Sequence, residues 1–321
     1  MPSTQAISTP GLPGPERLDT SAWQRSAIVP RTSSQAVAGR RLESAIYMGF
    51  VFVDRITAFD TDHARGQLHR AAGAPPLPHW LVLEAVGQLA AWIAMARSEF
   101  VNRPVAALLT EARIGSPAVG GVIDLEARID RFDGRAILYS GTASVAGRVV
   151  SELARGVGPL LPADLFDDPS ELRRRFEALR GPAPVNACGA ADPLPCTEIS
   201  GLVLGTGSGS AQLRVPESAP FFLDHFPRRP VYPATLLAAA QNQLAIPLAA
   251  QTLGVEPARL RPSRVVDFKV RSFSPPGQLL ELTAEARTPE RDGIAIAVAA
   301  SSDGKRIASG VLEYRLAPLH P

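Results

Sequence analysis

PFFLDHFPRRPVYPATLL, residues 220–237, is the stretch that decides how this chain folds. It joins an aromatic-rich loop, a His-Phe-Pro turn at His225, and a proline, Pro233, that opens the apolar segment 234–254. This segment is apolar almost all round, which is typical of a helix buried on every side. The runs that follow it alternate between apolar and polar residues, as strands do when one sheet face meets a core. We therefore predict an α+β fold in which an antiparallel sheet wraps around a long buried helix.

The same order of elements occurs earlier in the chain. An earlier apolar segment begins at Pro78 and carries Gln88, as the later one begins at Pro233 and carries Gln243; 233−78 and 243−88 both give 155. Similar strand-like runs follow each segment. A fixed offset of this kind indicates an internal duplication, so we predict two tandem units. Pro247 lies late in the second helix and has no N–H to donate, so we expect it to kink or end that helix.

Composition divides the chain into four parts. Residues 1–40 are rich in Pro, Ser, Thr and Gly and hold few large apolar side chains, so we expect a mostly disordered leader. Residues 161–195 form a Pro-rich linker with one short surface helix, capped by Asp168. The two units are then residues 41–160 and 196–321.

The charge balance and the cysteines exclude some classes of function. The 321 residues include 33 Lys and Arg against 31 Asp and Glu, a net charge of +2, whereas nucleic-acid binding needs clustered excess basic charge. Cys188 and Cys196 have no companion ligands at metal-binding spacing, so no metal site is expected. The chain opens without a signal-peptide pattern, and the most apolar stretch, residues 81–96, is too short to span a bilayer. We expect a cytoplasmic protein that binds a small acyl or metabolite ligand.

Two further motifs accompany residues 220–237. They are GFVFVDRI at 49–56 and LVLEAVGQ at 81–88, in which Glu84 and Gln88 form an E-x-x-x-Q pattern. Together the three resemble the hotdog-fold 3-hydroxyacyl-acyl-carrier-protein dehydratases of fatty acid synthesis. The resemblance covers most of the chain beyond the leader and the linker, and it implies two fused units, a double hotdog, without metal or organic cofactor. In that family each active site of a dimer takes a His from one partner and a carboxylic acid from the other.

The two units divide this catalytic pair between them. The second has His225, but Ala239 stands at the position that matches the acid. The first has Glu84, but Arg70 stands where the His is expected, with His69 one residue away. The resemblance therefore implies an intramolecular pseudo-dimer with one complete site, formed by His225 and Glu84. The mirror-related site is expected to be inert.

The pair suits the loss of water from a 3-hydroxyacyl thioester, which gives a trans-2-enoyl product. We expect His225 to remove the proton beside the thioester carbonyl, and Glu84, whose pKa an apolar helix should raise, to protonate the departing hydroxyl. The backbone amides of Ala234 and Thr235 open the second buried helix and are expected to hold the enolate oxygen. Three further residues are expected to contact the substrate, with core packing or loop-closing hydrogen bonds as the alternatives: Phe222, Phe226 and Gln88.

The expected partner is acyl carrier protein with its phosphopantetheine-linked substrate. Arg228 and Arg229, beside the His-Phe-Pro turn, are candidates to receive its acidic surface or the phosphate. Asp224 precedes the His, and Ala234 follows the helix-opening Pro, where the family usually has Gly; both departures bear on substrate range. The sequence leaves open whether further copies associate into a homo-oligomer.

Two other functions remain open. A hotdog acyl thioesterase shares the fold and would use a carboxylate and water on the thioester carbonyl, although the His-Phe-Pro turn favours dehydration. A catalytically silent hotdog partner of a fatty acid or polyketide synthase would need neither His225 nor Glu84. It predicts that these two side chains do not meet.

Overall fold

The computed structural model describes residues 49–71, 73–115, 121–185 and 198–317. The predicted leader at 1–40 and both cysteines lie outside the described residues. The elements of the first half are β1 (Arg55–Phe59), β2 (His63–Arg70), α2 (His79–Arg97), β3 (Asn102–Pro104), β4 (Leu108–Ile114), β5 (Gly121–Phe132), β6 (Ala136–Val145) and β7 (Arg148–Pro162). A 3-10 turn, η1 (Ala163–Leu165), and the helix α3 (Pro169–Leu179) lead towards the second half.

The second half repeats much of this order. Its elements are β8 (Ser200–Leu204), β9 (Ser208–Arg214), the 3-10 turn η2 (Pro220–Leu223), α4 (Ala234–Leu253), the 3-10 turn η3 (Pro257–Arg259), β10 (Leu260–Val270), β11 (Leu279–Ala286), β12 (Gly293–Ser302) and β13 (Lys305–Leu316).

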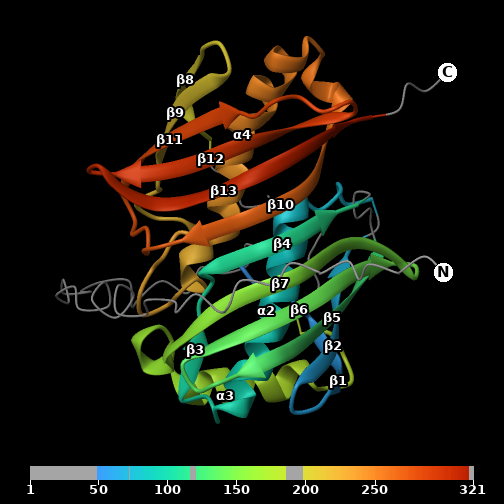
Figure 1. The fold of residues 1–321 in the computed structure, drawn as a ribbon. Coiled ribbons are helices and arrows are strands. Elements are labelled where there is room, and N and C mark those ends of the chain that lie inside the picture. Colours follow the sequence, from blue (N-terminus) through green and yellow to red (C-terminus); the bar gives the residue numbers. More distant parts are fainter. Residues whose placement is uncertain (1–48, 72, 116–120, 186–197, 318–321) are drawn as a thin grey trace, which may run out of the picture.

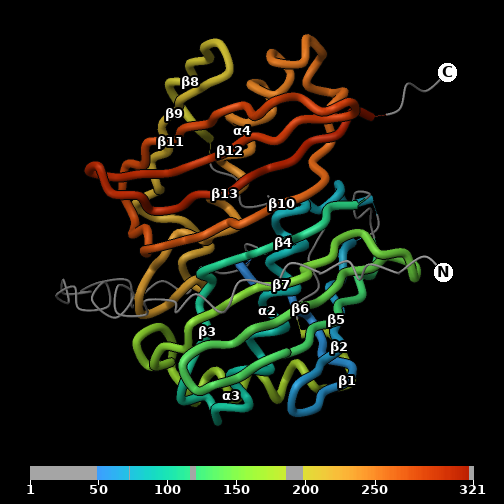
Figure 2. Tube along the Cα trace, in the orientation of Figure 1, coloured from blue at the N-terminus to red at the C-terminus, as the bar shows by residue number. Residues whose placement is uncertain are grey.

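One antiparallel sheet runs through both halves (Figure 1). Its strand order is β1-β2-β5-β6-β7-β4-β10-β13-β12-β11-β9-β8, and β3 pairs with β7 beside this path. From the centre outwards, β4-β7-β6-β5 on one side matches β10-β13-β12-β11 on the other. The halves therefore meet at a β4–β10 seam, where Ala112 lies opposite Val265 and Leu109 opposite Phe268. The same relative order of strands thus occurs on both sides of the seam, and Figure 2 shows the two halves at opposite ends of the sheet.

The two long helices, α2 and α4, fill the core. They lie on the same side of the sheet and contact each other, each packing mainly on the strands of its own half (Figure 1). Pro78 and Pro233 stand at their N-caps, as the sequence predicts. α4 ends at Gly254, whose φ of 64° is a left-handed conformation that glycine adopts without a steric penalty.

Pro247 does not end α4, contrary to the expectation of a shorter helix. The helix continues to Leu253. A proline inside a helix removes one backbone hydrogen bond and crowds the preceding turn, which typically costs about 3 kcal/mol or more. Leu244 and Leu248, on either side of the proline, are fully buried, and this packing holds the following turns in the core.

The short helix predicted in the linker is confirmed as α3. The Asp168 side chain caps it by accepting a hydrogen bond from the Ser170 amide at 2.9 Å. It is not merely a surface helix, because Leu172, Phe176 and Leu179 are buried. Their burial places α3 against the first half of the chain.

α2 passes the length and composition test for a membrane-spanning helix, so the expectation that its sequence is too short for this was wrong. Within the fold, 67% of the most apolar 18-residue stretch of α2 is buried inside the protein. Burial of this extent is typical of a core helix and accounts for the apolar sequence without a membrane. It is the one helix among the described residues that passes this test.

Asp54, just before β1, is a fully buried carboxylic acid. Its Oδ2 accepts a hydrogen bond from the His69 backbone amide at 2.6 Å, and its Oδ1 has no hydrogen-bond partner among the described residues. Burial raises the pKa of Asp54 to about 7, against the opposing effect of the His69 hydrogen bond. The folded state therefore holds this proton more tightly than the unfolded chain does. The resulting stabilisation is complete below about pH 4 and is lost as the pH rises through about 7.

We predict that Asp54→Asn, which keeps a carbonyl acceptor for His69 and removes the charge, changes stability in a pH-dependent way. Near pH 4 the variant should unfold with the same free energy as the wild type. Near pH 8 it should be more stable by up to a few kcal/mol. Denaturant unfolding at the two pH values measures this. An equal difference at both values would contradict the raised pKa.

Candidate active site

A cavity of about 660 Å³ is lined by residues from both halves. α2, β3, β6, β7 and α3 contribute from the first half and its linker, and the loop after η2, the start of α4 and β10 contribute from the second. His225 and Glu84 both line it. The structure therefore brings the two residues that the sequence assigns to separate units to one cavity.

His225 lies on the loop that follows η2. Its Nδ1 is 2.9 Å from the Val231 carbonyl oxygen, which can only accept, so Nδ1 carries the proton and Nε2 keeps its lone pair. The imidazole stacks on Phe226, with ring centroids 4.0 Å apart, and meets Phe50 edge-on at 5.3 Å. Burial lowers the pKa of His225 to about 4, helped by the positive charge of Arg103 and opposed by the Val231 hydrogen bond. The imidazole is thus a neutral base at pH 7.

Glu84 projects from α2 and receives a hydrogen bond at each oxygen. The Gln88 amide donates to Oε1 at 3.0 Å, and the Thr235 hydroxyl donates to Oε2 at 2.8 Å. Burial raises the pKa of Glu84, and these two hydrogen bonds and the charge of Arg103 oppose the rise. The Gln88 amide nitrogen can only donate, whereas the Thr235 hydroxyl can also accept. When Glu84 is protonated, its proton therefore lies on Oε2 and the Thr235 hydroxyl acts as the acceptor.

Two contacts join the halves at this point. The first is the Thr235–Glu84 hydrogen bond, which links the first turn of α4 to α2. The second runs through Phe50, whose backbone amide donates to Asp224 Oδ2 at 3.0 Å and whose carbonyl accepts from Gln88 at 3.0 Å. Asp224, which precedes His225, is therefore connected through Phe50 to Gln88, which lies one helical turn after Glu84.

The other predicted substrate contacts divide into two groups. Ala234, Thr235, Phe226 and Gln88 line the cavity. Phe222 does not; it is 7% exposed and packs against Phe221 in the core, with ring centroids 4.5 Å apart, which is the alternative of core packing. Successive residues of the 3-10 turn point in different directions, which takes Phe222 away from the cavity.

Gln88 acts within the protein. Its nitrogen donates to Glu84 and to the Phe50 carbonyl, and its oxygen accepts from the Phe52 amide at 2.9 Å. These are the loop-closing hydrogen bonds that the sequence offers as the alternative to a substrate contact. In the second half, Gln243 accepts from the Ile199 amide at 3.4 Å.

The residues of the expected mirror-related site lie elsewhere. His69 and Arg70 are in β2, where Arg70 is buried and donates to the Pro75 carbonyl at 3.0 Å. Ala239 packs against the apolar core. None of the three lines the cavity that holds His225 and Glu84.

Arg103 is a cavity residue that sequence reasoning missed. It lies in β3, donates to Asp167 Oδ2, and places its guanidinium carbon 4.3 Å from the centre of the Phe226 ring. Both members of the ion pair are largely enclosed, with side chains 16% and 6% exposed. Its positive charge lowers the pKa of both His225 and Glu84. No motif or spacing marks it, because its partner is 64 positions away.

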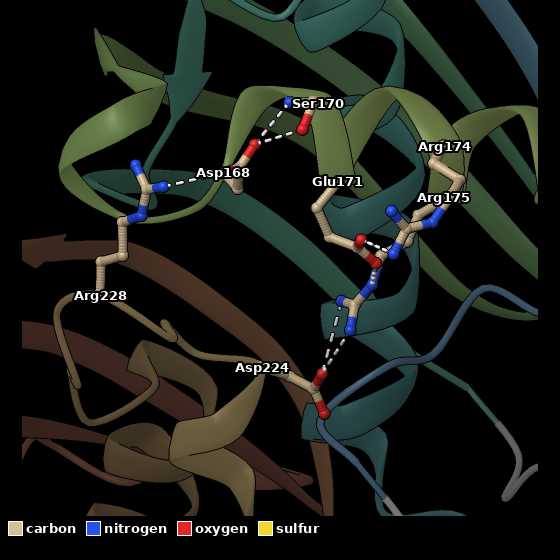
Figure 3. A network of polar contacts seen from close by, with 7 residues as sticks. All are labelled: Asp168, Ser170, Glu171, Arg174, Arg175, Asp224 and Arg228. Atoms are coloured by element: carbon tan, nitrogen blue, oxygen red, sulfur yellow. Dashed lines mark hydrogen bonds and ion pairs between the residues drawn. The ribbon is translucent and has the colours of Figure 1, made fainter. Parts of the chain in front are cut away.

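The arginines proposed to receive a carrier protein are engaged inside the chain. Arg228 pairs with Asp168 at 2.9 Å and donates to the Asp164 carbonyl, and the Arg229 guanidinium lies 4.7 Å from the centre of the Phe273 ring. Figure 3 shows Arg228 reaching the start of α3. Because 45% of the Arg228 side chain is still exposed, a docking role for these residues stays a prediction.

Asp224, the departure from the family pattern beside His225, faces α3 as well. Its Oδ1 lies 3.5 Å from the guanidinium of Arg175, which also contacts Glu171 (Figure 3). Together with the hydrogen bond from Phe50, this holds the His225 loop from two sides. Among the described residues, no group of three or more His, Cys, Asp or Glu side chains could hold a metal ion.

Comparison with known proteins agrees with this architecture. The FabA-like domain family matches residues 196–310, about a third of the chain, which include His225 and Thr235 but not Glu84. A Lactobacillus plantarum protein named as an oleoyl thioesterase superposes with a TM-score of 0.54 at 10% identity, over 80% of this chain and 97% of that one. The fold is a hotdog fold.

A second solved structure is similar. It is a tesB protein from Mycobacterium avium subsp. paratuberculosis, with a TM-score of 0.50, 10% identity, and 82% and 96% of the two chains covered. Comparison with curated protein sequences finds no match. At 10% identity, likeness between structures establishes the hotdog fold and leaves the reaction to be argued from the site.

The buried ion pair of Arg103 and Asp167 generates a stability prediction. Arg103→Met leaves the Asp167 carboxylate enclosed without its partner, so we expect the free energy of unfolding to fall by about 3 to 5 kcal/mol. The double variant Arg103→Met, Asp167→Asn should recover most of this loss. Denaturant unfolding of the four proteins measures it. Equal losses in the single and double variants would show that the pair does not act as a unit.

Proposed function

We propose that the protein is a dehydratase that removes water from 3-hydroxyacyl thioesters to give trans-2-enoyl thioesters, at one composite site shared by two fused hotdog units. The observation that carries the proposal is that a neutral His225 and a protonatable Glu84, from different halves, face one cavity. The FabA-like match to the half that holds His225 supports it.

The reaction needs a base, an acid and a group that holds negative charge. His225 Nε2 takes the proton from C2 of the substrate, and the electron pair forms the C2–C3 double bond as the C3–O bond breaks. Glu84 Oε2 gives its proton to the departing hydroxyl, which leaves as water. The backbone amides at the start of α4, including those of Ala234 and Thr235, stabilise the enolate-like thioester oxygen during the step. The proton then returns from His225 to Glu84 to reset the site.

The expected carrier of the substrate is acyl carrier protein. Arg228 and Arg229 both make contacts within the chain, so this partner is not argued from them. The acyl carrier protein remains a proposal that follows from the reaction class alone.

An acyl thioesterase is the second candidate, the activity in the name of the Lactobacillus plantarum relative. Hydrolysis would use Glu84 as an ionised base or nucleophile for the thioester carbonyl. The enclosed position that raises the pKa of Glu84 favours the protonated form, which suits dehydration better. The neutral His225 is also without a defined task in that alternative.

Replacement of either catalytic side chain tests the proposal. His225→Ala and Glu84→Gln should each lower kcat by about 10²-fold to 10⁴-fold, the usual contribution of a positioned acid or base. The assay follows the loss of water from 3-hydroxyacyl-pantetheine and carrier-protein thioesters, and the reverse hydration, by mass spectrometry. Unchanged turnover in His225→Ala would overturn the assignment.

The controls separate the alternatives. His69→Ala, which changes the histidine nearest to the mirror-related position, should keep wild-type activity. Release of free acid from the same substrates would identify the thioesterase. No reaction with any substrate in the wild type would favour the silent hotdog partner.

The pH dependence gives an independent test. Dehydration needs His225 neutral and Glu84 protonated, so kcat/KM should rise as the pH passes about 4 and fall as Glu84 ionises at a higher pH. Activity should therefore persist near pH 5.5, where an unperturbed histidine is mostly protonated. An acidic limb near pH 6.5, or a rate that only increases with pH, would contradict this scheme.

A further inference from the structure

The linker helix α3 forms part of the cavity wall. Leu172, Arg175 and Leu179, spaced three and four residues apart, line it from one face of the helix. Leu172 and Leu179 are also among the least exposed residues of α3, at 2% and 3%. A segment outside the repeated order of strands and helices thus borders the candidate active site.

One face of α2 lies along the same cavity. Glu84 and Gln88 are its polar members, and Ala91, Trp92 and Met95 follow at helical spacing. From Glu84 to Met95 the helix rises about 16 Å at about 1.5 Å per residue. An extended acyl chain advances about 1.2 Å per bond, so an acyl chain of about 13 bonds can lie along this face of α2.

The two helices meet at the far part of this face. Trp92 of α2 stacks near Phe176 of α3, with ring centroids 6.1 Å apart, and Phe100 lies 5.5 Å from the same ring. Glu84, two turns earlier, instead contacts Thr235 at the start of α4. The cavity lining therefore runs from the catalytic pair towards α3.

α3 is held in place by contacts with the first half of the chain on one side and with the loop that carries His225 on the other. Phe176 anchors it among aromatic side chains of the first half. On the other side, Arg175 reaches Asp224, and Asp168 at the N-cap pairs with Arg228 (Figure 3). The ion pairs involve the loop that carries His225, so the wall and the catalytic loop are positioned together.

We propose that α3 sets the length of the acyl chain that the site accepts, with Leu172 and Leu179 closing an apolar arm that suits a medium-length chain of about 12 to 14 carbons. This inference rests on the proposed function, since it takes the ligand to be an acyl thioester, and it adds the substrate class. The apolar side chains of both helices match an unbranched hydrocarbon rather than a polar chain.

The test measures binding, so that it does not depend on which reaction the site performs. S-alkyl pantetheine thioethers lack the carbonyl group and can be neither dehydrated nor hydrolysed. Titration calorimetry of the full chain with thioethers of increasing length should show affinity rising by up to about fourfold per methylene, then levelling at about 12 to 14 carbons.

Substitutions in α3 should move this limit in both directions. Leu172→Ala and Leu179→Ala should extend it by about two methylenes, and Leu172→Phe should shorten it by a similar amount. Glu177→Ala, on the exposed face of α3, and Leu125→Ala, in the core of β5 away from the cavity, are the matched controls and should leave the limit unchanged. Leu172→Phe removes no packing volume, so it tests the inference even where an alanine variant does not fold.

The outcomes distinguish the two proposals. An unchanged chain-length limit in folded α3 variants would overturn the role of α3 and leave the proposed reaction intact. A wild type that binds no alkyl chain at all would overturn both.

Discussion

The antiparallel pairing of β4 with β10 fixes the two halves of the chain in one register, and the candidate site depends on that register. The seam makes a single sheet, brings α2 and α4 into contact, and places the first turn of α4 beside Glu84. A shift of one residue in the seam would turn every side chain of these strands to the other face. The composite site is therefore a property of the whole fold rather than of either half.

Electrostatics then separate the proposed roles of His225 and Glu84. The same enclosure pushes the pKa of His225 down and that of Glu84 up, because burial disfavours whichever form is charged. Arg103 moves both values downward, which helps keep the imidazole neutral but favours ionised Glu84. Its pairing with Asp167 reduces the charge that reaches the cavity. A neutral base and a protonated acid are thus present at once without a metal ion in the proposed scheme.

Much of the fold and part of the candidate site were predictable from local sequence. The apolar helices and the motifs around His225 and Glu84 are patterns within a few turns of the chain, and the 155-residue offset is the distance at which such patterns recur. The interactions that sequence reasoning missed join residues that are far apart in the sequence. Arg103 meets Asp167, and Arg228 meets Asp168, only in the folded chain.

The remaining differences from expectation have local physical causes. Phe222, in the 3-10 turn η2, packs in the core, although the next residue, Leu223, lines the cavity. Pro247 breaks the helical hydrogen-bond pattern but not the helix, because Leu244 and Leu248 are held by tertiary packing. α3 lies at the surface as expected, but three apolar residues on one of its faces are buried, a contact that the expectation of a surface helix did not include.

The central claim is that His225 and Glu84, from opposite halves, act on one substrate. A crystal structure of the protein with a non-reactive 3-hydroxyalkyl pantetheine thioether, an analogue of the substrate, tests this most directly. The account predicts His225 Nε2 and a Glu84 carboxylate oxygen each within roughly 3 to 3.5 Å of the substrate, at C2 and at the 3-hydroxyl respectively. A bound ligand whose C2 and 3-hydroxyl contact only one of the two residues, or neither, would contradict it.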